Sequence, residues 1–252
     1  MGLNPPNIKL IVAEDYDQMS VKAAQIIADV LLTKPDAVLG FATGTTPVGL
    51  YAELVARYKS GELCFARATS FNLDEYLPIS RENECSYHNY MHRHLFSHIN
   101  IRREHIHIPD GQCADGYAEC AAYEANILAA GGIDIQLLGI GLNGHIAFNE
   151  PAAYFPGGTH IVELAESTVE ANRRFFSSSK DMPHRAITMG VGTIVMAKRL
   201  VLIASGIKKA GIVCEAIFGN VHPGVPASIL QFHPNVTVVL DKAAAQGLRT
   251  CI

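Results

Sequence analysis

The chain has 252 residues, of which 49% are hydrophobic and 17% charged, and its formal net charge is −4. This length and composition predict a globular protein with a sizeable core and exclude a disordered chain. The negative charge argues against non-specific binding to nucleic acid or an anionic membrane, and the apolar runs are too short for a membrane span.

The six cysteines form no CxxC pair and show no regular spacing. In a chain of this size they predict reduced, mostly buried thiols. The N-terminal residues MGLNPPN contain no apolar signal region, so we expect a cytoplasmic protein.

Short apolar strands alternate with amphipathic helices along the chain. Strands are predicted at Lys9–Val12, Val38–Ala42, Ala68–Leu73, Ile133–Ile140, Ala186–Met189, Leu200–Ala204 and Val236–Leu240. Helices are predicted over about 19–31, from Thr46 (N-cap) and Pro47 (first helical residue) to Gly61, and at 85–98, 115–130 and 206–218. This βαβ series predicts an α/β fold with a doubly wound, mostly parallel sheet and helices on both faces. No linker or repeat interrupts it, so residues 1–252 are expected to form a single domain.

The stretch from about Glu163 to Pro183 differs from the rest of the chain. It is polar, contains a Ser triplet and lacks a strong strand pattern. It is either a lid over a ligand site or an ordinary surface excursion.

The segment Ala42–Pro47, ATGTTP, lies between a predicted strand and a predicted helix. Gly44 allows a sharp turn, while Thr43, Thr45 and Thr46 supply hydroxyl donors next to the unpaired N–H groups of the helix start. These groups suit a phosphate, although no Lys-Ser/Thr follows as in a Walker A loop. The alternative is a plain capped helix start.

Asp74 follows the predicted strand Ala68–Leu73, in the segment FNLDEY. The carboxyl ends of strands in open α/β sheets are where ligands bind and catalytic groups collect. The alternative role for Asp74 is to cap the next turn.

The run Gly139–Pro151, GIGLNGHIAFNEP, follows another predicted strand. Its first six residues match GxGxxG letter for letter. A dinucleotide site needs a helix to open at the last glycine, but Asn149 and Pro151 interrupt the following segment. We therefore predict a tight turn and no NAD site.

The same loop carries Asn143, His145 and Glu150. An imidazole takes and gives a proton near neutral pH, and a nearby carboxylate orients it and stabilises its charged form. The three residues predict an acid–base group; the alternative is a histidine satisfied by backbone in a buried turn.

Two further sets of residues are candidate ligand sites. His88, His92, His94 and His98 have i,i+4 spacing that could hold zinc, but no HExxH motif or third acidic ligand accompanies them, so a surface face is favoured and no metal is expected. Arg174 and Lys209 are candidate anion clamps, and Lys209 follows a strand and the Ser205-Gly206 turn at a predicted helix start.

Together these segments resemble the glucosamine-6-phosphate deaminases nearly end to end. The matching segments are FATGTTPVGLY, SFNLDEY, GLNGHIAFNEP, NRRFF around Arg174, MGVGTI, SGIKKA around Lys209 and LQFHP at 230–234. The related 6-phosphogluconolactonases share a GHxA-type loop, but the Asn149-Glu150-Pro151 ending belongs to the deaminases.

The resemblance implies a Rossmann-like fold of the phosphosugar-isomerase type and an aldose–ketose isomerisation coupled to ammonia loss, with no metal and no coenzyme. It implies that the Thr43–Thr46 loop with Gly44, together with Arg174 and Lys209, holds the 6-phosphate of a small-molecule amino-sugar phosphate.

It also implies the catalytic roles. His145 opens the pyranose ring, and Asn143 and Glu150 position and tune it. Asp74 carries the C2 proton to C1 through an enolamine. The resulting imine takes up water and releases ammonia, leaving fructose 6-phosphate.

The chain departs from the family pattern at two places. Some members have Asp where this chain has Asn143, which shifts more of the charge stabilisation to Glu150. Allosteric members bind N-acetylglucosamine 6-phosphate with basic residues where this chain has His160, Val162 and Glu163, and with a C-terminal Tyr; we therefore predict no such activation.

Three alternatives stay open from the sequence: a 6-phosphogluconolactonase, a galactosamine-6-phosphate deaminase, and a non-catalytic sugar-phosphate sensor. A sensor in a transcription regulator would need a helix-turn-helix segment and a basic face, for which there is no spare length. The sequence does not choose between a monomer and a homo-oligomer.

Overall fold

A seven-stranded parallel sheet forms the centre of the computed structural model, which describes residues 8–166, 168–169, 176 and 182–250. The strands follow the order β1-β10-β9-β6-β2-β3-β5, and every neighbouring pair is parallel. Their bounds are β1 Ile8–Ala13, β2 Val38–Phe41, β3 Thr69–Asn72, β5 Ile106–His107, β6 Ile135–Leu138, β9 Leu200–Ala204 and β10 Val236–Asp241. The predicted α/β fold with a mostly parallel sheet is confirmed.

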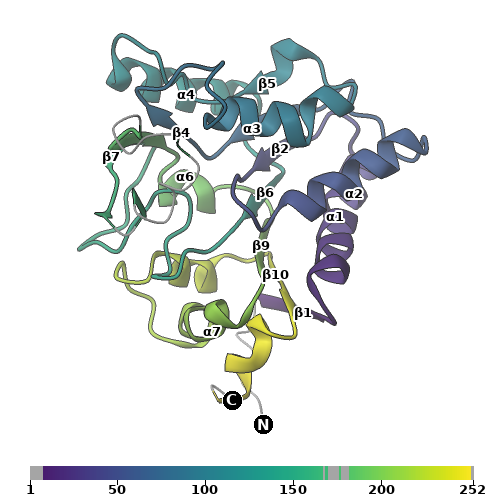
Figure 1. Cartoon of the computed structure of the whole chain (residues 1–252), viewed down its shortest axis with the longest axis vertical. Coiled ribbons are helices and arrows are strands. Elements are labelled where there is room, and N and C mark those ends of the chain that lie inside the picture. Colours follow the sequence, from purple (N-terminus) through teal and green to yellow (C-terminus); the bar gives the residue numbers. More distant parts are fainter. Residues whose placement is uncertain (1–7, 167, 170–175, 177–181, 251–252) are drawn as a thin grey trace.

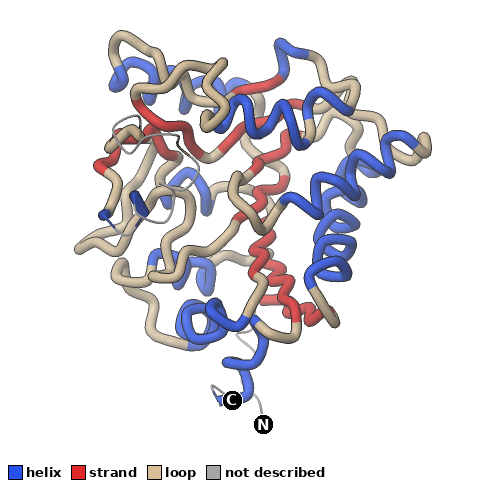
Figure 2. The backbone as a smooth tube through the Cα atoms, viewed as in Figure 1, coloured by secondary structure: helices blue, strands red, loops and turns tan. Residues whose placement is uncertain are grey.

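Helices cover the sheet on both faces (Figures 1 and 2). The helices are α1 Tyr16–Thr33, α2 Val48–Lys59, α3 Tyr87–His94, α4 Gly116–Ala129, α6 Val191–Val195 and α7 Ala210–Phe218. Short 3-10 helices span Phe96–His98, Arg103–His105, Ile207–Lys209, Pro226–Phe232 and Ala244–Thr250. In Figure 1, α1 and α2 lie on one side of β1, β9 and β10, and α7 lies on the other. The buried residues Met19, Ala23, Ile27 and Leu31 of α1 recur at helical spacing, which explains why this face packs against the sheet.

The order of the strands reverses direction between β2 and β6. The chain passes from β2 through α2 outward to β3, while β6 pairs with β9 on its opposite side. Adjacent strands whose connections leave in opposite directions form a topological switch point, and the crevice at their carboxyl ends is where such sheets bind ligands.

A second, three-stranded antiparallel sheet lies next to this crevice, with the order β4-β8-β7. Its strands are β4 Asp74–Leu77, β7 His160–Glu163 and β8 Arg185–Thr188. The strand predicted at Ala186–Met189 is therefore real but belongs to this sheet and not to the parallel one. Periodicity identifies a strand without identifying its partner; here β4 begins two residues after β3 ends and pairs with β8.

Two predicted helix boundaries are wrong. Helix α2 begins at Val48 with Pro47 as its N-cap and without a side-chain cap, so Thr46 is not the cap. Instead, the hydroxyl of Tyr16 on α1 caps one free N–H group at the start of α2, because it accepts a hydrogen bond from the Gly49 N–H at 2.8 Å. The helix predicted over 85–98 is divided at Leu95, whose φ of −140° interrupts the helical backbone between α3 and the following 3-10 helix.

The expectation of reduced thiols is only partly correct. Cys64, Cys113 and Cys120 are free thiols, whereas Cys214 is disulfide-bonded. Of these four side chains only Cys120 is buried and Cys64 is exposed, so the expectation of mostly buried cysteines is also wrong. The spacing of cysteines in a sequence carries no information on which of them meet in space, which is why the prediction missed this bond.

Several predictions concern residues that lie partly or wholly outside the described part of the chain. Residues 167, 170–175 and 177–181 of the segment predicted as a possible lid lie outside the described residues, as does Arg174. His160, Val162 and Glu163 form part of β7, and the expected lack of allosteric activation stays a prediction. In the described part of the chain, no helix has the length and apolar character to cross a membrane.

Candidate active site

A cleft of about 960 Å³ lies at the carboxyl ends of four adjacent parallel strands, β9, β6, β2 and β3. Each strand supplies the segment that follows it. The candidate residues that line the cleft are Thr43, Gly44, Thr45, Thr46, Asp74, Asn143, His145 and Lys209. The topology thus brings together candidates from four separate sequence segments, while Arg174 lies outside the described residues.

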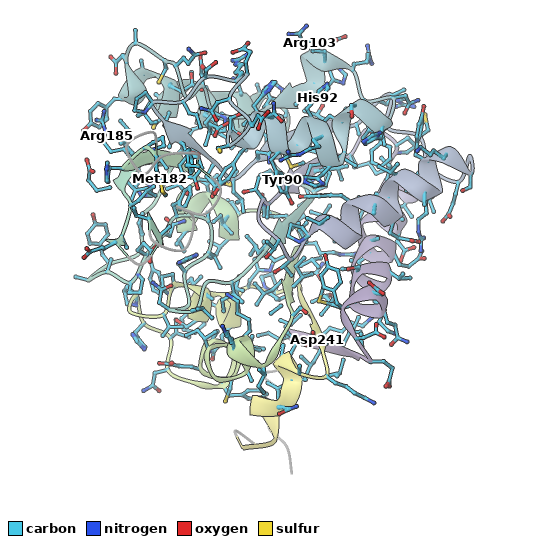
Figure 3. The ribbon with its side chains drawn as sticks, viewed as in Figure 1. Tyr90, His92, Arg103, Met182, Arg185 and Asp241 are labelled. Atoms are coloured by element: carbon cyan, nitrogen blue, oxygen red, sulfur yellow. The ribbon has the colours of Figure 1, made fainter. Side chains whose placement is uncertain are left out.

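Tyrosine hydroxyls from two helices hold the loop after β2. Tyr90 of α3, labelled in Figure 3, donates to the Gly44 carbonyl at 2.6 Å, and Tyr16 of α1 donates to the Thr46 carbonyl at 3.1 Å. Gly44 has a φ of +107°, which strongly favours glycine. With these carbonyls engaged, the loop has a fixed shape and its threonines line the cleft.

Lys209 reaches the same cleft from the segment after β9. Its Nζ donates to the Ile140 carbonyl at 2.5 Å, and burial lowers its pKa from the ordinary lysine value. Asp241, the last residue of β10, accepts from the Gly206 N–H at 3.0 Å and thereby fixes the turn that leads to Lys209. A half-buried ammonium group beside a hydroxyl-rich loop is a suitable partner for an anion.

Asp74 is the first residue of β4 and only 6% exposed. No described residue donates a hydrogen bond to its carboxyl group, although that group lines the cleft. Burial, and then the neighbouring carboxylate of Glu75, raise the pKa of Asp74 to about 8. Such a carboxyl group is a stronger base than an ordinary aspartate once it has ionised.

Glu150 lies in the opposite kind of environment. Its Oε2 accepts from Asn143 Nδ2 at 2.6 Å, and its Oε1 accepts from the Thr168 hydroxyl and lies 3.3 Å from His145 Nδ1. Burial alone would raise the pKa of Glu150, but the contacts with His145, Thr168 and Asn143 outweigh it and lower the pKa to about 2. A carboxylate that is ionised at neutral pH therefore faces the imidazole.

Gly141, the second glycine of the GxGxxG letters, leaves the space that this imidazole occupies. A Cβ at Gly141 would lie 2.3 Å from Cε1 of His145, so the ring occupies space that only glycine leaves free. After Gly144, which has a φ of +86°, the chain forms a turn with an isolated bridge between Ile146 and Asn149 and no helix. The predicted tight turn is confirmed.

The histidine-rich segment lies elsewhere. His88 and His92 line a separate cavity of about 420 Å³ together with Arg81 and Arg103, and Figure 3 shows His92 and Arg103 at the same end of the molecule. Among the residues that the structure describes, no group of three or more His, Cys, Asp or Glu side chains is arranged to hold a metal ion.

Three residues near the reacting groups were not predicted. Thr168 donates to Glu150, Tyr87 lines the cleft, and Glu75 lies beside Asp74. The sequence offered a clue to two of them: Glu75 directly follows the candidate Asp74, and Tyr87 lies near the start of the helix predicted over 85–98. A single threonine in a polar stretch offers no such clue.

Comparison with known proteins agrees with this geometry. Residues 13–239 match the family described as glucosamine-6-phosphate isomerases/6-phosphogluconolactonase. The chain is 49% identical over 241 residues to a glucosamine-6-phosphate deaminase of Clostridioides difficile (strain 630), covering 96% of this chain and 97% of the relative. It is 50% identical over 241 residues to that of Halothermothrix orenii, covering 96% and 100%.

Solved structures give the same result. A monomeric glucosamine-6-phosphate deaminase of the NagB superfamily superimposes with a TM-score of 0.92 at 44% identity, covering 95% of this chain and 99% of that one. A 6-phosphogluconolactonase from Trypanosoma brucei has a TM-score of 0.73 at 19% identity, covering 95% and 98%, which shows a shared fold. The chain belongs to the glucosamine-6-phosphate isomerase/6-phosphogluconolactonase family.

Proposed function

We propose that this protein is a glucosamine-6-phosphate deaminase: it converts D-glucosamine 6-phosphate and water to D-fructose 6-phosphate and ammonia. We place it in the cytoplasm and treat residues 1–252 as one catalytic domain. One observation carries the proposal: a buried carboxyl group that receives no hydrogen bond from the described residues and an imidazole–carboxylate pair line or border the same cleft as an anion-binding loop.

The phosphate end of the substrate is assigned to the Thr43–Thr46 loop, with Gly44 at its turn, and to Lys209. Their hydroxyls, backbone N–H groups and ammonium group complement a phosphate dianion. Arg174 is proposed as a further cation on the strength of the sequence resemblance. Binding energy from the phosphate, remote from C2, orients the reacting carbons.

Ring opening is assigned to His145. The imidazole removes the proton of the C1 hydroxyl and delivers one to the ring oxygen, so that the C1–O5 bond breaks and an aldehyde forms. The ionised Glu150 stabilises the imidazolium that exists between the two transfers, and Asn143 holds Glu150 through its 2.6 Å hydrogen bond.

Isomerisation is assigned to Asp74. Its carboxylate takes the C2 proton while O1 takes a proton from solvent, which gives an enolamine. The carboxyl group then returns its proton to C1, and the nitrogen releases one proton to solvent, which gives an imine at C2. Water adds to C2 and ammonia leaves, so the ketone of fructose 6-phosphate remains. These steps move only protons, water and ammonia, and they need no redox cofactor.

A 6-phosphogluconolactonase activity requires only hydrolysis of a ring ester and gives no task to a base at C2. The raised pKa of Asp74, which suits a base that removes a proton from carbon, therefore favours the deaminase. The relatives at 49–50% identity carry the deaminase name, whereas the lactonase shares only the fold at 19% identity.

The test is an ammonia assay on the purified protein with glucosamine 6-phosphate, galactosamine 6-phosphate and 6-phosphogluconolactone, alongside the Asp74→Asn variant. We expect ammonia and fructose 6-phosphate from glucosamine 6-phosphate with wild type and almost none with the variant. Hydrolysis of the lactone without any ammonia release would contradict the proposal, as would binding of the sugar phosphates without turnover.

A further inference from the structure

Glu75 is a buried carboxylate directly next to the proposed base. It is the second residue of β4 and 2% exposed. Its Oε1 accepts from the backbone N–H groups of Tyr76 and Tyr87, and its Oε2 accepts from that of His88, each at 2.9 Å. Tyr87 and His88 are the first two residues of α3, so this side chain binds the start of the helix.

Helix α3 already has an ordinary N-cap. The Ser86 hydroxyl accepts from the Asn89 N–H at 3.0 Å, and Glu75 takes the two preceding amides that Ser86 leaves unpaired. Burial of a carboxylate is costly, while the partial positive charge at a helix start and three amide donors favour the ionised form. The three amides thus offset part of the cost of burial, so that the carboxyl group of Glu75 carries its negative charge once the pH exceeds a pKa of about 7.

The same contacts fix one wall of the cleft. Tyr87 lines the cleft, and its ring packs at 4.8 Å from that of Tyr76 and stacks at 6.0 Å and 13° on that of Phe148. Successive side chains on a strand point to opposite faces, so Asp74 faces the cleft while Glu75 faces α3. Glu75 therefore joins two parts of the cleft wall: it belongs to the strand that carries Asp74, and its side chain holds the backbone of Tyr87.

Within the described part of the chain, few charges compete with Glu75 for influence on Asp74. The described titratable groups that interact with the pair are the phenols of Tyr51, Tyr76, Tyr87 and Tyr123 and the guanidinium of Arg81. Across the sheet, β8 places the uncharged residues Thr188 and Ile187 opposite Asp74 and Glu75. Arg81 is exposed, and it supports the ionised form of Glu75 without reaching Asp74.

We propose that Glu75 is a positioning residue for the proposed deamination: its buried negative charge holds the first turn of α3 against β4 and makes the neighbouring Asp74 a stronger base toward C2. This inference rests on the proposed function, because only a base at carbon gains from the added basicity.

The order of ionisation follows from the environments. Burial raises the pKa of Glu75 to about 7, with the amides of Tyr87, His88 and Tyr76 acting in the opposite direction, while that of Asp74 is raised to about 8. Glu75 accepts three backbone N–H groups whereas Asp74 accepts none from the described residues, so Glu75 loses its proton first as pH rises, and its charge then opposes the ionisation of Asp74. Removal of that charge must shift the ionisation of Asp74 to lower pH.

The test compares Glu75→Gln with a matched control, Asp115→Asn. Asp115 likewise accepts the first amides of a helix, α4, at 2.9 and 3.1 Å, but it lies outside the cleft lining. The pH dependence of kcat/KM for ammonia release is measured, and the side-chain carboxyl carbons of the ligand-free protein are titrated by ¹³C NMR.

For Glu75→Gln we expect the acid limb of the profile and the Asp74 titration to move down by about one pH unit. We expect kcat to fall about threefold, because a less basic carboxylate abstracts the proton more slowly. Glu75→Asp keeps the charge and should keep the wild-type profile even if it melts at a lower temperature. Asp115→Asn should leave the profile and the Asp74 titration in place.

A purely structural role predicts a different result: Glu75→Gln would lower the melting temperature while the profile and the Asp74 titration stay at their wild-type pH, which would overturn the proposal. If Glu75→Gln does not fold, the wild-type titration decides, since ionisation of Asp74 before Glu75 would equally overturn it. If wild type releases no ammonia, the proposed function fails, whereas the NMR titrations still test the coupling of the two carboxyl groups.

Discussion

Two carboxyl groups beside the same cleft have opposite environments. Asp74, at the junction of β3 and β4, receives no hydrogen bond from the described residues, and its pKa rises to about 8 through burial and the neighbouring Glu75. Glu150, in the loop after β6, is contacted by Asn143, Thr168 and His145, and its pKa falls to about 2.

Burial alone pushes both pKa values upward, so the difference comes from the neighbours: the carboxylate of Glu75 beside Asp74, and the hydrogen-bond donors and the imidazole beside Glu150. A buried carboxylate that accepts no hydrogen bond binds a proton tightly, whereas one that accepts several hydrogen bonds binds a proton weakly. Beside a single cleft, the fold thus holds a carboxyl group with a high proton affinity, Asp74, and an ionised carboxylate that faces an imidazole, Glu150. The proposed mechanism needs both.

The largest expected effect comes from Asp74→Asn. The amide cannot take the C2 proton, so we expect kcat to fall by about 10³-fold or more, with substrate binding retained. Ammonia release and exchange of the C2 hydrogen with deuterated water measure the two steps. A variant that keeps a tenth of wild-type exchange would show that another group is the base.

The second effect tests the phosphate end of the cleft, away from both carboxyl groups. Lys209→Ala removes a charge-assisted hydrogen bond of about 1.5–3 kcal/mol, so we expect kcat/KM to fall by roughly 10- to 100-fold, mainly through KM. Lys59→Ala, an exposed lysine at the end of α2, is the control. A loss confined to kcat would mean that Lys209 acts at the reacting carbons.

A smaller loss is expected from Glu150→Gln, which keeps the size of the side chain but removes the charge that faces His145. We expect kcat to fall by about tenfold, because the imidazolium loses one stabilising partner while the base at C2 stays intact. Steady-state kinetics at neutral pH measure the change. Equal losses in Glu150→Gln and Asp74→Asn would contradict the division of tasks between them.

The sequence predicted the parts of this molecule that depend on local pattern. Strand Leu200–Ala204 agrees residue for residue, and the positions of Asp74 and His145 just after strands placed them at one crevice. Parallel strands put their carboxyl ends at one edge, so a few correctly identified strands suffice to gather such residues.

Contacts between distant segments could not be predicted in the same way. The pairing of β4 with β8, the hydrogen bond from Thr168 to Glu150 and the disulfide of Cys214 depend on which segments meet in space. The binding of Glu75 to the start of α3 likewise joins residues 12 and 13 positions apart that no periodicity relates. Of these contacts, the hydrogen bond from Thr168 directly lowers the pKa of Glu150.

The smallest expected effect concerns stability: the contributions of the two carboxyl groups to the free energy of unfolding change in opposite directions with pH. The pKa of Asp74 is raised in the folded state, so its contribution to stability is full below its ordinary range and is lost as pH rises toward about 8. Asp74→Asn does not titrate, and above pH 8 we expect it to be more stable than wild type by about 1 kcal/mol, or roughly 2–4 °C.

Glu150 should behave in the opposite way. Its folded pKa is depressed, so its contribution is present above its ordinary range and is lost as pH falls toward about 2. Glu150→Gln should therefore melt below wild type at pH 7, with the difference shrinking in acid. Thermal melts of Asp74→Asn between pH 4 and 9 and of Glu150→Gln between pH 2 and 7 measure this, and a stability loss at pH 9 in Asp74→Asn would mean that its carboxyl group is held by donors after all.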